Sequence, residues 1–154
     1  MIVAWRLTKA RHAAIAFDGE GAQLEGGRWN PRGISVVYLS DHPALAALEA
    51  FIHLKGAATK IKFVMFRVDI PAGVSVLELA IAELPAGWRN EPPSPETMAV
   101  GEKWVQEGKA AILKVPSVLV PAAANLVLNP RHPEVSKIQI GRAEIFSFDP
   151  RMWK

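Results

Sequence analysis

The chain has 154 residues, and we expect residues 1–154 to form one domain. Its 18 basic and 15 acidic residues are scattered, so the net charge of +3 marks no nucleic-acid-binding surface. The absence of cysteine excludes disulfides, a thiolate nucleophile and a cysteine-ligated zinc. No apolar run reaches the roughly 18 residues of a membrane span, and residues 1–15 carry charges that a signal peptide lacks. We therefore expect a cytoplasmic protein with no membrane contact.

The sequence of the first third of the chain indicates strands separated by a polar stretch. Residues 3–7 form an apolar strand, and residues 8–24 are small and polar, with no dinucleotide-binding or Walker glycine pattern. Residues 25–29 are expected to form a second strand that enters the stretch Gly-Gly-Arg-Trp-Asn-Pro-Arg-Gly at 26–33. A turn then leads into residues 34–39, whose β-branched and aromatic side chains indicate a buried strand.

A helix is expected from 43 to 55, because capping-type side chains precede Pro43 and Gly56 follows. Its body is apolar nearly all round, which is typical of a buried helix. Glu49 is its one formal charge, and an unpaired carboxylate there would cost several kcal/mol. Glu49 should therefore have a cation or hydroxyl partner, or line a cleft. A structural salt bridge is the competing interpretation.

The sequence of the remainder of the chain indicates further strands, with one more helix between them. Residues 61–70 form a long strand, a short strand or helix start follows in 74–82, and the proline-rich 83–95 is a loop. A helix runs from about 95 to 108. The last strands are expected at 111–115, 124–128 and, as a closing hairpin through Gly141 and Arg142, 137–140 and 144–148.

The stretch at 26–33 combines groups suited to an anionic ligand. Paired glycines permit close backbone approach, and Arg28 offers a planar fork of donors for phosphate or carboxylate. Trp29 offers a flat apolar face, and Asn30 can both donate and accept hydrogen bonds. The alternative is a hairpin with a surface arginine and a core tryptophan.

Other polar residues stand at isolated places in apolar stretches. Tyr38 is the only tyrosine, and in a strand it is most often a core residue with a satisfied hydroxyl. Ser117 follows Pro116 at an expected strand break, where a serine most often satisfies the backbone. The four histidines show no metal-ligand spacing, so we expect no metal site.

The order of the motifs GGRWNPRG, VVYLS, ALAALEAF, VPSVLVP and ANLVLNPRHP resembles the RES-domain toxin family, from Trp5 to about Phe148. These are the toxins of RES–Xre toxin–antitoxin modules. The family is named after an arginine, a glutamate and a serine, which fall by motif on Arg28, Glu49 and Ser117. Tyr38 matches a tyrosine of the family's pocket.

The resemblance implies an α+β fold of mixed, mostly antiparallel sheets with a few helices, similar to ADP-ribosyltransferases of the diphtheria-toxin type. It implies NAD+ as a substrate rather than a cofactor, degraded by phosphorolysis or hydrolysis at the nicotinamide–ribose bond. It also implies an Xre-like antitoxin as partner. A homodimer is a further expectation, because the chain is rich in apolar residues.

The residue types fit this chemistry. Arg28 can bind the pyrophosphate, and Tyr38 or Trp29 can stack on the cationic nicotinamide. Glu49 can stabilise an oxocarbenium-like ribose, and Ser117 can orient an amide or a phosphate. At the rim we expect three further residues, namely Asn30, Asn129 and His132.

Two other functions remain open at this stage. One is a mono-ADP-ribosyltransferase that modifies a host protein. The other is a non-catalytic module that binds an anionic metabolite or a partner protein.

Overall fold

The computed structural model describes residues 1–54 and 60–153. The α-helices are α1 (Glu20–Glu25), α2 (Pro43–Phe51) and α3 (Pro95–Glu107), and 3-10 turns lie at Ala10–Ile15, Ile81–Glu83, Pro133–Lys137 and Pro150–Trp153. The strands are β1 (Ile2–Lys9), β2 (Val37–Ser40), β3 (Phe63–Ile70), β4 (Val76–Glu78), β5 (Ile112–Pro116), β6 (Ala124–Leu128), β7 (Gln139–Ile140) and β8 (Glu144–Phe146). None of these helices has the length and apolarity needed to cross a bilayer.

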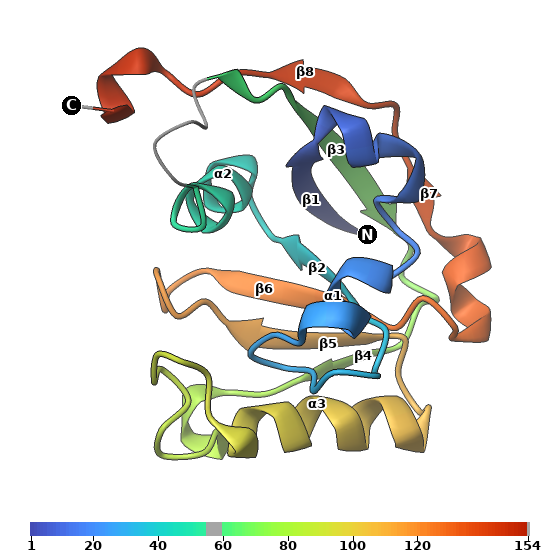
Figure 1. Ribbon diagram of the computed structural model, residues 1–154. Coiled ribbons are helices and arrows are strands. Elements are labelled where there is room, and N and C mark those ends of the chain that lie inside the picture. The colour runs from blue at the N-terminus through green and yellow to red at the C-terminus, as the bar shows by residue number, and fades with distance from the viewer. Residues whose placement is uncertain (55–59, 154) are drawn as a thin grey trace.

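The strands form one sheet in the order β4-β5-β6-β2-β1-β3-β7, with β8 also paired to β3. All pairs are antiparallel except β4 with β5. The expected α+β fold with a mixed, mostly antiparallel sheet is confirmed. The register joins β1 to β2 only at Trp5 and Ser40, and the sheet turns there into two halves (Figure 1).

A buried arginine strengthens this short junction between β1 and β2. The Arg6 side chain donates from Nη1 to the carbonyl oxygen of Tyr38 at 3.0 Å and from Nε to that of Ala16 at 2.6 Å. Burial lowers the pKa of Arg6 to about 10, and the nearby Asp18 partly opposes that shift. Arg6 therefore stays charged at neutral pH and holds β1 against β2 with charge-assisted bonds.

The alternation of side chains divides the core between the two faces of the β4-β5-β6-β2 half. Val37, Leu39 and Leu126 pack on one face against Ala4 and Val68 of the other half. The opposite face is covered by α3 and the loop before it (Figure 1). Three tryptophans lie in this second cluster, at positions 29, 88 and 104.

Helix α3 fixes the stretch at 26–33 against the sheet. Ser94 caps the helix by accepting from Thr97 N–H at 3.4 Å, and Gly108 ends it with φ +62°. A Cβ on Gly101 would overlap the carbonyl oxygen of Trp29, so only glycine permits this approach of the helix to the backbone.

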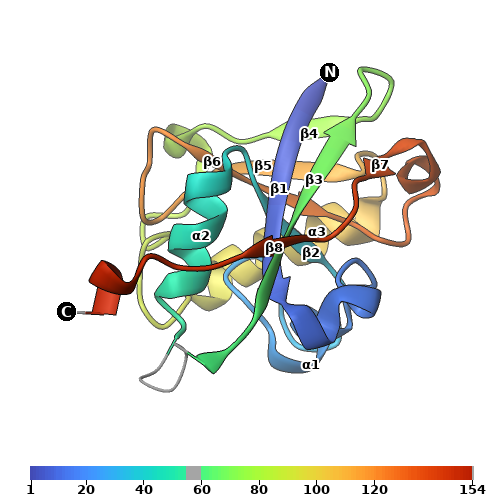
Figure 2. The ribbon, with the colours of Figure 1, turned by 90° about the horizontal axis from the view of Figure 1, so that it is seen from above.

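Helix α2 begins as expected but ends sooner. His42 caps it through Nδ1, which accepts from Ala44 N–H at 3.1 Å, and Pro43 lies in its first turn. The helix ends at Phe51, and the expected stop near Gly56 lies outside the described residues. Figure 2 shows α2 beside β1, with the C-terminal segment crossing over β3.

Two expectations about secondary structure were wrong. Residues 25–29 form no strand, because Gly27 and Asn30 close a tight bridge on each other. The last two strands form no hairpin, because β7 and β8 pair at separate places along the free edge of β3.

Candidate functional site

The structure brings Glu49 and Ser117 into contact from distant parts of the chain. Ser117 follows the end of β5, and its Oγ–H donates to Glu49 Oε1 at 2.9 Å. The same Oγ accepts from the N–H groups of Leu119 at 3.1 Å and Val120 at 3.2 Å. Ser117 is completely buried, so these bonds hold its hydroxyl in one orientation. Within the described part of the chain, Glu49 Oε2 makes no hydrogen bond.

A polar pair lies beside this contact on the same sheet end. The register places Asn125 of β6 opposite Ser40 of β2 and Val115 of β5, and Ser117 lies two residues beyond Val115. Asn125 Nδ2 donates to Ser40 Oγ at 3.4 Å. Sequence reasoning missed Asn125. The available signal was a polar residue in the otherwise apolar strand Ala-Asn-Leu-Val-Leu.

Arg28 is bound by the segment that precedes α3. Its Nη1 donates to the carbonyl oxygens of Trp88 at 2.9 Å and Asn90 at 2.7 Å, and its Nη2 pairs with the Glu91 carboxylate at 3.1 Å. The Arg28 side chain is 14% exposed, whereas that of Glu91 is 79% exposed. The carbonyl bonds therefore anchor the guanidinium, and the ion pair to Glu91 is open to exchange with solvent or ligand.

The segment at 88–91 connects Arg28 to the Glu49–Ser117 pair. Arg89 Nη2 donates to the carbonyl oxygen of Val118 at 2.8 Å, and Val118 directly follows Ser117. Arg28, the 88–91 segment and the turn at 117–120 thus form one continuous chain of contacts that ends at Glu49. We define the candidate site as Arg28, Ser40, Glu49, Ser117 and Asn125.

Tyr38, Trp29 and Asn30 form a buried network next to this site. The Tyr38 hydroxyl donates to Asn30 Oδ1 at 2.6 Å and accepts from Trp29 N–H at 3.1 Å. Asn30 Nδ2 donates to the carbonyl oxygens of Ala22 at 2.8 Å and Ile34 at 3.0 Å. A Cβ on Gly27 would lie 2.7 Å from the Tyr38 hydroxyl, so glycine makes room for this network.

The hydrogen bonds of this network occupy the Tyr38 hydroxyl and the Asn30 amide, and the expected stacking of Tyr38 on nicotinamide stays a prediction. Burial raises the pKa of Tyr38, and this outweighs the lowering by the Trp29 N–H and the Arg28 charge, so the phenol stays neutral. Asn30 is 0% and Trp29 2% exposed. The structure therefore places Trp29 in the core, as the alternative interpretation of this stretch expected.

Asn129 and His132 lie at the opposite end of β6. Asn129 follows Leu128, whereas Ser117 N–H donates to the carbonyl oxygen of Ala123 at 2.9 Å, six residues or about 20 Å away at the usual strand rise. Asn129 Oδ1 accepts from Arg131 N–H at 3.1 Å, and His132 caps the turn at Pro133–Lys137. The structure does not bring these two residues to the Glu49–Ser117 pair.

The comparison with protein families matches the chain as a whole. A family model described as "RES domain" covers residues 3–149. The chain belongs to the RES domain family of toxins. The resemblance inferred from the motifs is therefore confirmed. The assignment of the family's arginine, glutamate and serine to Arg28, Glu49 and Ser117 stays a prediction from the motifs.

The curated relatives that align with this chain over nearly their whole length are named as toxins. The "Prs ADP-ribosylating toxin" of Sphingobium sp. strain YBL2 is 37% identical, with 96% of this chain and 94% of that protein aligned. A "Toxin Res" of Yersinia enterocolitica is 34% identical, with 96% and 97% aligned. Among solved structures, the Mycobacterium tuberculosis MbcT–MbcA toxin–antitoxin complex contains a chain with TM-score 0.77 and 20% identity. That match covers 99% of this chain and 86% of the other, and at this identity it shows the shared fold.

Proposed function

We propose that this RES toxin depletes NAD+ by breaking the bond between nicotinamide and ribose, with phosphate or water as the acceptor. The single observation that carries this proposal is the hydrogen bond from Ser117 to Glu49. A carboxylate on an apolar helix is fixed there by a buried hydroxyl, and its second oxygen is left available to a ligand.

Glu49 supplies the charge that this reaction needs. Departure of nicotinamide leaves positive charge on the ribose, as in glycoside hydrolysis. A fixed carboxylate stabilises that charge in the transition state more than in the ground state. Nicotinamide leaves as a neutral group, so no general acid is required. The acceptor then attacks the ribose carbon from which nicotinamide has departed.

The other site residues hold the two ends of NAD+. The amide of Asn125 and the hydroxyl of Ser40 can pair with the nicotinamide carboxamide or the ribose hydroxyls, since they offer both donors and acceptors. Arg28 keeps its Nη1 on the carbonyls of Trp88 and Asn90, and the pyrophosphate replaces Glu91 on Nη2. This exchange is inexpensive because Glu91 is highly exposed.

The partner in this proposal is an Xre-like antitoxin that covers the site. The related fold of MbcT was solved together with MbcA in a toxin–antitoxin complex, which supports a protein partner for this chain too.

A second candidate function is transfer of ADP-ribose to a protein. The name of the Sphingobium relative, an ADP-ribosylating toxin, favours it. Both functions break the same bond and differ only in the acceptor. A non-catalytic module that binds an anion or a partner protein is the remaining alternative.

The test is incubation of the purified protein with NAD+, with and without inorganic phosphate, while nicotinamide release is followed. Release in either buffer is expected, and a requirement for phosphate identifies phosphorolysis. Radiolabelled NAD+ in the same reaction with cell extract shows whether label accumulates on a protein. Absence of release and of labelling by folded protein contradicts both enzymatic functions and favours the binding module.

A further inference from the structure

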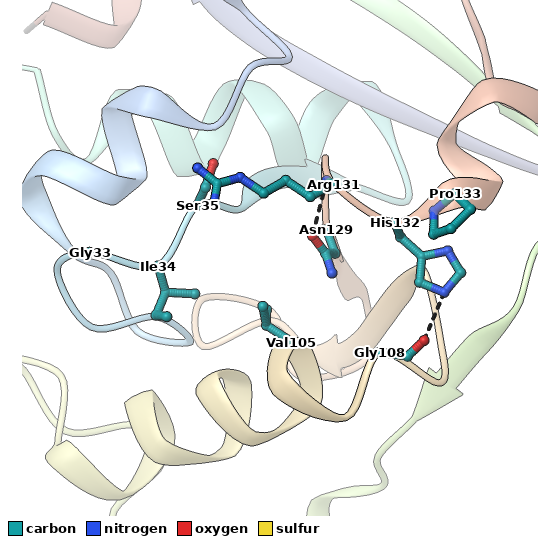
Figure 3. A pocket seen from close by; sticks show the side chains of 9 residues that line it. All are labelled: Gly33, Ile34, Ser35, Val105, Gly108, Asn129, Arg131, His132 and Pro133. Carbon is teal, nitrogen blue, oxygen red and sulfur yellow. Dashed lines mark hydrogen bonds between the residues drawn. The ribbon is translucent and has the colours of Figure 1, made fainter.

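A pocket of about 340 Å³ lies at the end of β6 remote from the candidate site. Its wall is built from the loop before β2, the end of α3 and the residues after β6 (Figure 3). The lining residues are Gly33, Ile34, Ser35, Val105, Gly108, Asn129, Arg131, His132 and Pro133. None of these nine residues is acidic.

Asn129 is oriented toward this pocket by the backbone. Its Oδ1 accepts from Arg131 N–H at 3.1 Å, which leaves the Nδ2 amide on the opposite side of the side chain. Asn129 is only 6% exposed, and no hydrogen bond to Nδ2 is found among the residues that the structure describes. Figure 3 shows this amide pointing into the space between Val105 and His132. Among the described residues no fully buried side-chain nitrogen or oxygen lacks a hydrogen-bond partner, so this Nδ2 group is open to the pocket and free to donate to a ligand there.

Arg131 supplies a second donor group and a charge. Its side chain extends across the edge of the pocket toward the loop of Ser35 (Figure 3). In residues 1–54 and 60–153 we find no ion pair for its guanidinium. The neighbouring Glu134 accepts at Oε2 from Ser75 N–H and Oγ–H at 2.7 and 2.6 Å, and within the described residues it forms no ion pair with Arg131.

His132 adds no charge in this arrangement. Its Nδ1 accepts from Glu134 N–H at 3.1 Å, and its Nε2 lies 3.0 Å from the carbonyl oxygen of Gly108. The ring is therefore the neutral tautomer that donates from Nε2. Ile34, Val105 and Pro133 give the pocket apolar walls.

We propose that this pocket binds the oxyanion group of a small ligand, a phosphate or a carboxylate, on Arg131 and the Asn129 amide. The apolar body of the ligand packs against Ile34 and Val105. This site is separate from the Glu49–Ser117 pair, so the proposal does not depend on NAD+ cleavage.

The test is a titration of the protein with inorganic phosphate, and separately with acetate, followed by ¹H–¹⁵N NMR. We expect saturable shifts at the amides of residues 33–35 and 131. Asn129→Asp keeps the acceptor for Arg131 N–H but replaces the free donor with a repelling charge. Arg131→Gln removes the cation. Each variant should weaken binding at least about tenfold. Lys137→Gln, which removes an exposed cation outside the pocket, should leave binding unchanged.

The two probes distinguish the source of the oxyanion. Binding of phosphate alone assigns a phosphate ligand, and binding of acetate alone assigns a carboxylate. The proposal is overturned if neither probe gives saturable shifts up to about 20 mM. It is also overturned if Asn129→Asp and Arg131→Gln bind both probes like the unaltered protein, or if the shifts map to Arg28 and Glu49 instead.

Discussion

Glu49 illustrates how a single residue can be accommodated on an otherwise apolar helix. Its carboxylate is held by a hydroxyl that is itself fixed by two backbone N–H groups. No cation is involved, so the negative charge of Glu49 is not neutralised by a side-chain partner within the described residues. An available negative charge is what a reaction with a cationic transition state requires.

Asn125 is the residue whose role sequence reasoning did not anticipate, and its substitution tests the extent of the site. Asn125→Ala removes an amide whose one hydrogen bond within residues 1–54 and 60–153, to Ser40 at 3.4 Å, is long, so the free energy of unfolding should change by less than about 1 kcal/mol. The KM for NAD+ should rise about tenfold if the amide contacts the substrate. Steady-state kinetics measure this, with Gln106→Ala on the exposed face of α3 as the control. An unchanged KM would remove Asn125 from the site.

Gly27 is predicted to be essential for the network around Tyr38. Gly27→Ala would place a Cβ 2.7 Å from the Tyr38 hydroxyl and 2.9 Å from Asn30 Oδ1. Because all three groups are packed together, we expect a loss of about 1–3 kcal/mol in the free energy of unfolding. Gly21→Ala is the matched control, since nothing lies within 4 Å of that position and alanine favours a helix. Urea denaturation compares them, and equal stabilities would contradict the packing described here.

At the scale of elements, local patterns predicted the helices and strands better than their pairing. The caps at His42, Ser94 and Gly108 follow from side chains within four residues of each helix end. The hairpin expected at 137–148 does not form, because β7 and β8 each pair with the edge of β3 and not with each other. The local sequence does not indicate that β3 has a free edge. Likewise, Arg28 was expected to face a ligand, but carbonyls sixty residues away occupy half of its guanidinium.

The segment at 88–91 gives a prediction about substrate affinity. If the pyrophosphate replaces Glu91 on Arg28, Glu91→Gln removes a competitor and should lower the KM for NAD+ by about two- to fivefold. Glu107→Gln, which removes an exposed carboxylate that pairs with Lys103 at 3.8 Å, is the control. Kinetics at low ionic strength would show the effect most clearly. A higher KM in Glu91→Gln would indicate that the ion pair assists binding.

The turn at Pro133–Lys137 gives a prediction about pH. Hydrogen bonds from the Ser75 hydroxyl and N–H hold the pKa of Glu134 below its ordinary value of 4.5. A carboxylate with a lowered folded pKa stabilises the fold above the unfolded pKa and loses this effect as pH falls through the folded pKa. Glu134→Gln should therefore lower the melting temperature at pH 7, and the deficit should shrink between about pH 5 and pH 3. Thermal unfolding measures it, with the exposed Glu25→Gln as control. A deficit that is constant with pH would contradict this linkage.

Across the whole molecule, the sheet divides at the junction of β1 and β2, and the candidate site lies on the β4-β5-β6-β2 half. That half presents the ends of β2, β5 and β6 to helix α2 and to the 88–91 segment (Figure 1). The motifs predicted the family, which is confirmed. They also selected Arg28, Glu49 and Ser117, whose roles stay predictions although Glu49 and Ser117 are in contact. The motifs did not tell which end of β6 faces Glu49, because strand pairing decides this. Asn125 lies at the end near Ser117 and Asn129 at the other end. The homodimer stays a prediction.

The central claim is that Glu49 acts through its charge and not through its packing. Glu49→Gln preserves the shape of the side chain and an acceptor for the Ser117 hydroxyl, so its melting temperature should stay within a few degrees of the unaltered protein. The rate of nicotinamide release from NAD+ by the two proteins under identical conditions is the most direct measurement. We predict a fall of at least about a hundredfold in Glu49→Gln. Equal rates, or a variant that fails to fold, would contradict the claim and leave Glu49 a structural residue.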